Sequence, residues 1–366
     1  MKILRSLAVP LAALSLAAGA IAAPVAGASE VTPADVAQGA ELATITQPES
    51  PNRQVASRDW YQETKDNDRV VHLQAYSPSM GREIPLAVIT PADNSKPRPT
   101  LYMLNGAGGA EQNMDWLSMS PILDVYEDKN VNVVIPMEGA FSYYTDWRET
   151  PGNGYLDNSQ LWETFLTKEL PGPLEEHLGA SHERGIAGMS MSATSALLLA
   201  EHNPGFYDTV GSYSGCAATS DPLSRMMAEL TVNRGGGTVD QMWGPMGDPN
   251  THYNDALINA EGLRGTKVYV SNASGLAGAT DLPGYYIERG IDPSEASSGA
   301  ATLIIEGGVI EAATNTCTHN LKAKMDSLGI PADWNFRPTG THSWTYWNQD
   351  LWDSWPTFDR AFTTDE

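Results

Sequence analysis

The stretch Arg184-Gly185-Ile186-Ala187-Gly188-Met189-Ser190-Met191-Ser192 joins a short strand-like run to a helical run rich in alanine and leucine. A serine between small residues at such a turn is typical of a nucleophile elbow, whose strained backbone lifts the hydroxyl clear of the turn. The first N–H groups of the helix then face any oxyanion that forms beside the serine. The stretch therefore predicts Ser190 as a nucleophile and the amide of Met191 as an oxyanion donor.

The base that activates Ser190 is expected later in the chain, because sites of this type order their triad as serine, acid, histidine. Three of the four later histidines are poorly placed: His202 lies in the helix after the turn, His252 in a polar loop and His319 on a predicted helix. His342 lies in a loop directly after the last strand-like run, from which it can reach the serine. We therefore predict His342 as the base.

The acid of the triad must lie between the serine and the histidine. Glu311 is the first choice, because it opens an amphipathic helix that is predicted to pack beside the last strands. Its carboxylate would fix the histidine tautomer and stabilise the imidazolium that forms during attack. From the residues alone, Glu306, Asp292 and Asp281 remain alternatives.

A glycine-rich turn, Leu104-Asn105-Gly106-Ala107-Gly108-Gly109, follows an early strand-like run. The flanking glycines allow the backbone to direct the Ala107 amide into the site, so Ala107 is the predicted second oxyanion donor. The turn lacks the lysine and the following serine or threonine of a phosphate-binding loop. It therefore does not indicate a nucleotide site.

The spacing of apolar residues predicts the fold. Two alternating runs, residues 70–76 and 83–89, predict an antiparallel hairpin. Later apolar runs, typical of buried parallel strands, alternate with helix-like segments. The strand-like runs cover residues 100–104, 131–137, 185–188, 210–214, 267–270 and 333–336, and the helix-like segments cover residues 159–177, 191–201, 222–230 and 311–327. This alternation predicts the α/β-hydrolase fold, a doubly wound, mostly parallel sheet with an N-terminal antiparallel hairpin.

The N-terminus has the pattern of an export signal, with Lys2 and Arg5 before an apolar stretch that ends in small residues. We expect a signal peptide over residues 1–28, a poorly ordered lead-in over residues 29–57 and an α/β-hydrolase catalytic domain over residues 58–366. No later run approaches the roughly 20 apolar residues that a membrane span needs. The net charge of −23 argues against nucleic acid or an anionic membrane as partner. The protein is predicted to be secreted and to reside in the cell envelope.

The chain has two cysteines, Cys216 after a strand-like run and Cys317 on the predicted helix that begins at Glu311. In an exported protein two cysteines favour one disulfide, which here would close a loop of about 100 residues. We expect this bridge to support the helix that carries the predicted acid.

Five short motifs carry a resemblance to a known family. They are Leu104-Asn105-Gly106, Phe141-Ser142-Tyr143-Tyr144-Thr145-Asp146-Trp147, Gly188-Met189-Ser190-Met191-Ser192, Met242-Trp243-Gly244-Pro245 and Gly340-Thr341-His342-Ser343-Trp344-Thr345-Tyr346-Trp347. With them the chain resembles, over about residues 69–355, the secreted mycoloyltransferases of the antigen 85 type, and especially their corynebacterial members.

This resemblance implies an extracytoplasmic acyltransferase that moves a mycoloyl group from trehalose monomycolate through a Ser190 acyl-enzyme. The acceptor would be a second trehalose monomycolate, which gives trehalose dimycolate, or a hydroxyl of wall arabinan or protein. The resemblance also implies the acid Glu311 and the base His342, and it implies neither a metal nor a cofactor. Its oxyanion amides fall on Ala107 and Met191. A secreted serine carboxylesterase is the alternative, and a catalytically silent adhesin is a third hypothesis.

Sugar contacts are expected from Asn105, Trp344 and Asp146, and walls of an apolar groove from Leu117, Met119 and residues 271–299. The mycobacterial members of the family have an aspartate at the position of Asn105 and an arginine near Gly108. Residues 271–299 also exceed their mycobacterial counterpart in length, and we consider them a candidate lid.

Overall fold

A nine-stranded sheet is the centre of the part of the chain that this computed structural model describes, residues 41–363. Its spatial order is β1-β2-β3-β5-β4-β6-β7-β8-β9, with antiparallel pairs from β1 to β5 and parallel pairs from β5 to β9. The strands are β1 (Thr44–Thr46), β2 (Val70–Ser77), β3 (Arg82–Ile89), β4 (Thr100–Leu104), β5 (Asn132–Pro136), β6 (Arg184–Met189), β7 (Thr209–Tyr213), β8 (Lys267–Ala273) and β9 (Asp333–Arg337). The α/β-hydrolase sheet with its N-terminal hairpin is thus confirmed, whereas the predicted signal peptide lies outside the described residues.

The hairpin pairs β2 with β3 along their whole length, and β1 adds a third antiparallel strand to it. Two short helices, α2 (Arg53–Ala56) and α3 (Asp59–Thr64), lie between β1 and β2. The sequence predicts a poorly ordered lead-in over residues 29–57, and residues 41–57, the part of it that the structure describes, contain β1 and α2. The backbone of β1 is paired, and Val55 of α2 is buried. Both elements are too short to show a periodicity in the sequence.

Helices cover both faces of the sheet, and each face has its own hydrophobic core. Leu104 and Ile186 belong to the core that includes α7 and α8, whereas their neighbours Met103 and Ala187 belong to the core that includes α5, α16 and α17. Because side chains alternate along a strand, a strand buried on both faces must be apolar at nearly every position. Every residue of β4, β5, β6 and β7 is indeed buried.

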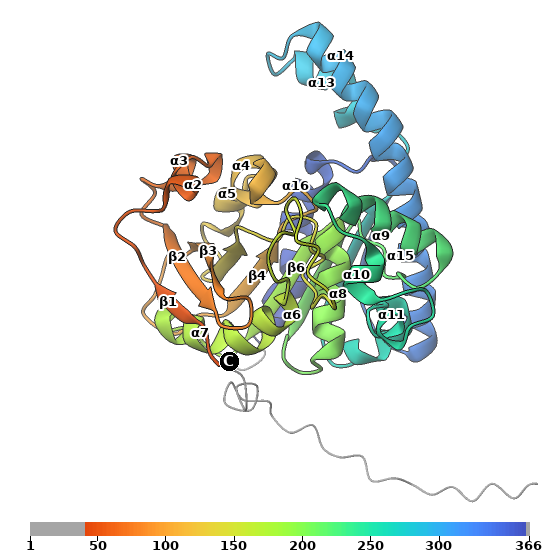
Figure 1. Cartoon of the computed structure of the whole chain (residues 1–366). Helices are drawn as coiled ribbons and strands as arrows, with labels where there is room; N and C mark the ends of the chain where they lie inside the picture. Colours follow the sequence, from red (N-terminus) through yellow and green to blue (C-terminus); the bar gives the residue numbers. More distant parts are fainter. Residues whose placement is uncertain (1–40, 364–366) are drawn as a thin grey trace, which may run out of the picture. The chain divides into compact units, whose positions relative to one another are not determined.

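The remaining helices follow the strands in the order of the chain (Figure 1). They are η1 (Ala110–Gln112), α4 (Trp116–Met119), α5 (Ile122–Tyr126), α6 (Trp162–Thr164), η2 (Phe165–Glu169), α7 (Pro171–Leu178), α8 (Met191–His202), α9 (Pro222–Gly235), α10 (Val239–Trp243), α11 (Pro249–Tyr253), α12 (Ala256–Asn259), η3 (Ala260–Leu263), η4 (Ala279–Asp281), α13 (Pro283–Ile287), α14 (Pro293–Thr302), η5 (Leu303–Gly307), α15 (Gly308–Leu328), α16 (Trp344–Asp353) and α17 (Trp355–Phe362). Among the described residues, no helix is both long and apolar enough to cross a membrane.

The sequence predicts neither a helix nor a strand in the segment directly before Glu311, but this segment is helical. We call α13, α14 and η5, residues 283–307, the arm. The arm runs directly into the N-terminus of α15, and Figure 1 shows α13 and α14 beyond the edge of the sheet, at that end of α15. α13 buries none of its residues, and α14 buries only Ala296 and Ala300. The arm is therefore helical without being part of either core.

Candidate active site

Ser190 occupies the turn between β6 and α8, at the carboxyl edge of the parallel strands. Its backbone angles, φ 57° and ψ −120°, lie in a region that residues with a side chain rarely adopt. The Ser190 amide donates to the Tyr213 carbonyl on β7, at 2.8 Å, which fixes the turn against the neighbouring strand. A Cβ on Gly188 would lie 2.4 Å from the Ser192 carbonyl oxygen, so only glycine fits there. The turn has the geometry predicted for an elbow.

Ser192, where the motif usually has a second glycine, is fully buried in the turn. Its Oγ accepts a hydrogen bond from the Met189 amide at 3.0 Å and lies 3.1 Å from the Leu104 carbonyl at the end of β4. The hydroxyl therefore joins the elbow to the strand that precedes the glycine-rich turn. This contact explains how the turn accommodates serine.

Three side chains from distant parts of the chain form one hydrogen-bonded series at the elbow. Ser190 Oγ lies 2.7 Å from His342 Nε2, and His342 Nδ1 lies 2.8 Å from Glu311 Oε2. A carboxylate only accepts, so Nδ1 donates to Glu311 and the unprotonated Nε2 accepts from the serine hydroxyl. Such an imidazole can take the hydroxyl proton as the oxygen attacks.

Glu311 is fully buried in the first turn of α15, and its other oxygen is held by three donors. Oε1 accepts from Ser214 Oγ at 2.8 Å, from Asn272 Nδ2 at 2.9 Å and from the Ala273 amide at 2.7 Å. These bonds satisfy the carboxylate and leave Oε2 to His342. Sequence reasoning missed Ser214 and Asn272. Their position near the carboxyl ends of β7 and β8 was the available signal.

The three alternative acids lie elsewhere. Glu306 is exposed on η5, and Asp292 caps α14 by accepting from the Ser294 amide at 2.8 Å. Asp281 is buried and accepts from Thr341 Oγ1 and Tyr346 Oη, each at 2.7 Å. These two bonds attach η4 to the loop of His342 and to α16, which follows that loop. The geometry therefore favours Glu311 as the partner of the histidine.

His342 is fixed by the backbone as well as by its ring contacts. Its amide donates to the Gly307 carbonyl at 3.1 Å, at the junction of the arm and α15. Its ring packs edge-on against Trp347, with ring centroids 5.0 Å apart. One face of the histidine loop is thus tied to the same helical segment that carries Glu311.

An apolar cavity of about 370 Å³ opens beside Ser190 and His342. Its walls are α9 and the first turns of α15, which contribute Leu223, Met226, Leu230, Val309 and Ile310. The three α9 side chains are 52–63% exposed, and Val309 is 70% exposed. Neither Leu117, Met119 nor residues 271–299 line this cavity, which corrects the predicted groove walls. Residues 271–299 therefore do not cover the cavity in this structure.

Comparisons with known proteins show the family to which this chain belongs. The Esterase family matches residues 77–358. Diacylglycerol acyltransferase/mycolyltransferase Ag85A of Mycobacterium tuberculosis is 32% identical over 300 residues, which cover 80% of this chain and 81% of the relative. Diacylglycerol acyltransferase/mycolyltransferase Ag85C of Mycobacterium leprae is 31% identical over 290 residues, 77% of this chain and 79% of the relative. The chain belongs to the antigen 85 mycolyltransferase family. These relatives are mycobacterial, so the expected closeness to corynebacterial members stays a prediction.

Solved structures agree on the fold of this mycolyltransferase family member. MPT51 (FbpC1) of Mycobacterium tuberculosis superposes with a TM-score of 0.62 at 23% identity and covers 78% of this chain and 96% of its own. An S-formylglutathione hydrolase from Agrobacterium tumefaciens gives a TM-score of 0.56 at 15% identity, with 80% and 96% covered. Both likenesses concern the fold alone.

The turn that carries the predicted oxyanion donor Ala107 is held from both sides. The Ala107 carbonyl accepts from the Phe141 amide at 2.8 Å, so the backbone of this mycolyltransferase loop is fixed. Asn105 is fully buried, donates to the Pro136 carbonyl at 3.0 Å and accepts from the Trp116 amide at 3.1 Å. Both ends of its side-chain amide are used, so Asn105 shapes the loop and does not present itself to a sugar. The predicted sugar contact of Asn105 is corrected for this reason.

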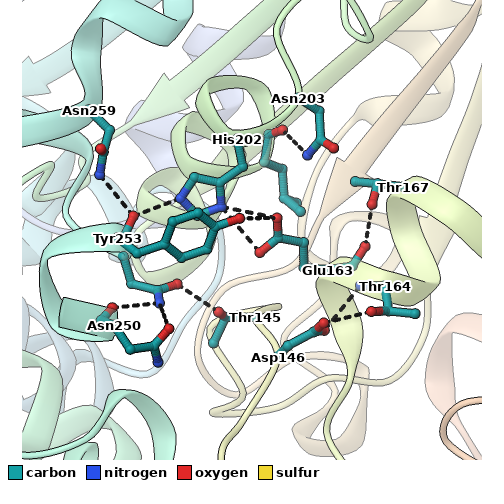
Figure 2. Close-up of polar contacts among 12 residues, drawn as sticks. Thr145, Asp146, Glu163, Thr164, Thr167, His202, Asn203, Asn250, Tyr253 and Asn259 are labelled. Atoms are coloured by element: carbon teal, nitrogen blue, oxygen red, sulfur yellow. Dashed lines mark hydrogen bonds and ion pairs between the residues drawn. The ribbon is translucent and has the colours of Figure 1, made fainter. Parts of the chain in front are cut away.

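The other two predicted sugar contacts differ in accessibility. Trp344 is partly exposed and packs edge-on against Trp116 and Trp347, with centroids 5.3 Å apart in both pairs. Asp146 accepts from the Thr164 amide at 3.0 Å and from Thr164 Oγ1 at 2.6 Å (Figure 2). Both carboxylate oxygens of Asp146 are thus engaged with one threonine. Trp344 is the better placed of the two for a sugar.

A second histidine–glutamate pair lies next to Asp146. It differs from the pair of His342 and Glu311 in the group that the histidine Nε2 faces. His202 Nδ1 lies 3.0 Å from Glu163 Oε1, and its Nε2 lies 2.7 Å from the Tyr253 carbonyl (Figure 2). The Tyr253 ring stacks on the imidazole at 3.7 Å, and its hydroxyl donates to Glu163. Because Nε2 faces a carbonyl and not a hydroxyl, this pair is structural.

The predicted disulfide is present between Cys216 and Cys317. Cys216 follows β7 and lines the apolar cavity, and Cys317 lies on α15, six residues after Glu311. The bridge therefore attaches the middle of α15 to the strand end that supplies Ser214.

Proposed function

We propose that the chain is an extracytoplasmic acyltransferase whose triad is Ser190, Glu311 and His342. The observation that supports this best is the Ser190–His342–Glu311 hydrogen-bonded series at the mouth of an apolar cavity. An apolar cavity suits a long acyl chain, and a deprotonable serine beside it suits attack on the ester of that chain.

In the first half-reaction Ser190 Oγ attacks the ester carbonyl of the donor and its proton passes to His342 Nε2. Glu311 stabilises the resulting imidazolium through Nδ1, and the amides of Ala107 and Met191 donate to the oxyanion. The intermediate then collapses. The C–O bond to the leaving sugar breaks, the sugar oxygen takes the proton from Nε2, and the acyl group stays on Ser190 as an ester.

In the second half-reaction an acceptor hydroxyl loses its proton to His342 Nε2 and attacks the Ser190 ester. Collapse returns the proton to Ser190 Oγ and releases the new ester. Trehalose monomycolate is the proposed donor, because the relatives are named mycolyltransferases. The proposed acceptors are a second trehalose monomycolate, which gives trehalose dimycolate, and hydroxyls of wall arabinan or of protein. These substrates lie in the cell envelope, where we place the secreted protein.

Trp344 is the proposed sugar-stacking residue, because it is partly exposed at the histidine loop. Asp146 also stays a proposed sugar contact, which would require it to exchange its hydrogen bonds to Thr164 for bonds to the sugar. A hydrolase with the same triad would use water as the acceptor, so the fate of the acyl-enzyme distinguishes the two activities.

The test is to load the protein with a short-chain trehalose monoester and to quantify free acid against diester as the acceptor concentration rises. We expect diester to dominate at saturating acceptor, and no product from the Ser190→Ala variant. Dominant free acid at saturating acceptor would replace the transferase with a secreted carboxylesterase.

A further inference from the structure

The arm and Leu282, the residue directly before it, expose large aliphatic side chains that the proposed mechanism does not use. Leu282, just before α13, is 48% exposed, Ile287 is 41%, Ile291 is 43%, and Ile305 is 66%. The helices of the arm pack chiefly on one another and on η5, so they bury little apolar area. A segment that keeps this much aliphatic surface in water gains little stability by folding alone, and such surfaces commonly mark interaction sites.

The exposed aliphatic surface continues into the active-site cavity. η5 leads directly into the first turn of α15, where Val309 is 70% exposed and Ile310 is 45% exposed. Both side chains line the cavity with Ser190, and Leu223 and Leu230 of α9 form the opposite rim. The apolar surface of the arm therefore leads to the entrance of the acyl cavity, so that one long apolar molecule can contact both.

The arm is also fixed to the active site at its base. Asp281, directly before Leu282, accepts from Thr341 Oγ1 and Tyr346 Oη, on either side of His342. At the other end the Gly307 carbonyl accepts from the His342 amide. The arm thus projects from two anchor points beside the reacting histidine.

The charge of the arm limits what it can bind. Its charged residues are Glu288, Arg289, Asp292, Glu295 and Glu306, and the whole chain carries a net charge of −23. The guanidinium of Arg289 lies 3.6 Å from the ring centroid of Tyr285. A surface with four acids and one arginine does not attract anionic headgroups. Tyrosines such as Tyr285 and Tyr286, with an apolar ring and a polar tip, suit the boundary between headgroups and acyl chains.

We propose that the arm and the exposed rim of α9 and α15 dock on the surface of an uncharged lipid aggregate, from which an ester donor reaches the cavity. The inference rests on the proposed function only for the role of the donor; the docking itself needs no turnover. Aliphatic side chains of the arm enter the boundary between headgroups and acyl chains. An acyl chain then passes from the aggregate along the apolar rim of the cavity to Ser190.

The experiment measures sedimentation of the full-length exported chain with vesicles of phosphatidylcholine, and with mixed phosphatidylcholine–phosphatidylglycerol vesicles. The arm variant carries Leu282→Gln, Ile291→Gln and Ile305→Gln, none of which lines the cavity. The control variant carries Ile258→Gln and Met246→Gln, which change side chains that are 48% and 54% exposed and lie outside both the arm and the cavity. Hydrolysis of a water-soluble short-chain ester reports on the active site of each variant.

We expect the wild-type chain and the control variant to bind phosphatidylcholine vesicles, with no gain from the anionic lipid. The arm variant should lose at least about tenfold in the partition constant, as expected when three aliphatic side chains no longer enter the lipid, and should keep its short-chain hydrolysis. Equal binding by the arm variant, or no binding by the wild type, would overturn the proposal. A wild-type dimer that the arm substitutions dissociate would instead make the arm an interface between two copies. If the wild-type chain does not hydrolyse the short-chain ester, that result counts against the proposed function and not against docking.

Discussion

Glu311 and Ile305 lie six residues apart on one continuous helical segment, yet their surroundings are opposite. Glu311 is fully buried and has both carboxylate oxygens in hydrogen bonds, whereas Ile305 is 66% exposed on the arm. In the proposed mechanism Glu311 needs one fixed geometry, which burial and complete hydrogen bonding provide. A long, flexible acyl chain, as in the proposed donor, can bind to an exposed apolar surface in many poses. The junction at Gly307 and Gly308 separates these two requirements within one helix.

The largest expected effect concerns Ser190, Glu311 and His342 with their hydrogen-bond partners, which we call the fixed side. His342→Ala removes the proposed acceptor of the serine proton, so we expect kcat/KM to fall about 10⁴- to 10⁶-fold. The matched control is His202→Ala, which breaks the second histidine–glutamate pair. We expect turnover of that variant to stay within a few-fold of the wild type, as measured with a short-chain ester. Near-normal turnover of His342→Ala would contradict the triad.

A smaller loss is expected from the acid. Glu311→Gln keeps the size of the side chain but cannot hold the histidine tautomer in the same way, so kcat should fall about 10²- to 10⁴-fold. Glu306→Gln, five residues earlier on the exposed side, should leave kcat unchanged. If the Glu306 variant proved the more damaging of the two, the acid would have to be reassigned to the arm.

The disulfide should stabilise the fixed side. Replacing Cys216 and Cys317 together by serine reopens a loop of 101 residues, which the chain-entropy model equates with a loss of about 5 kcal/mol in the free energy of unfolding. Denaturant unfolding followed by fluorescence measures the change. An unchanged unfolding midpoint would show that α15 is held by its other contacts alone.

Strain at the elbow gives a subtler effect. Ser190→Gly and Ser190→Ala both remove the hydroxyl, but only glycine is at ease at φ 57°. We expect the glycine variant to be more stable than the alanine variant by about 1–2 kcal/mol, with both inactive. Equal melting temperatures would mean that the backbone at residue 190 is not strained.

The smallest effect concerns pH. Burial, only partly offset by Arg82, raises the pKa of Glu138 to about 7 from an ordinary 4.5. The folded state therefore keeps a proton that the unfolded state has lost, so the stability gained from this group falls as the pH rises from 4.5 through 7. In the arm, hydrogen bonds from Ser294 lower the pKa of Asp292, and its contribution is lost as the pH falls. The difference in the free energy of unfolding between pH 5 and pH 8 should be smaller in Glu138→Gln than in the wild type. Asp292→Asn should leave this difference unchanged, because the Asp292 carboxyl is ionised throughout that range.

The strands and the elbow can be predicted because their signals in the sequence are local. The strands appear as apolar runs, the elbow as a serine between small residues, and chain order selects His342. The donors to Glu311 could not be predicted in the same way, because Ser214 lies 97 residues away and Asn272 lies 39 residues away. Only the folded sheet brings them together.

The exposed apolar surface of α9 and the arm is predicted less well from the sequence, for a different physical reason. Leu223, Met226, Met227 and Leu230 follow the spacing of an amphipathic helix, but such a pattern does not say whether the apolar face meets protein or ligand. In α9 most of this face is exposed at the cavity, and the buried residues are Ser224, Arg225, Ala228, Val232 and Gly235. The sequence marks the start of α14 with Asp292-Pro293, a capping residue before a proline.

The most direct test of the account is the covalent intermediate itself. The wild-type chain is mixed with a short-chain trehalose monoester and quenched in acid within the first turnover, and its peptides are mapped by mass spectrometry. We predict one added acyl group, on the peptide that contains Ser190, which disappears when acceptor is supplied before the quench. No acyl group on Ser190 in an enzyme that still turns over, or an acyl group on another residue, would contradict the central claim.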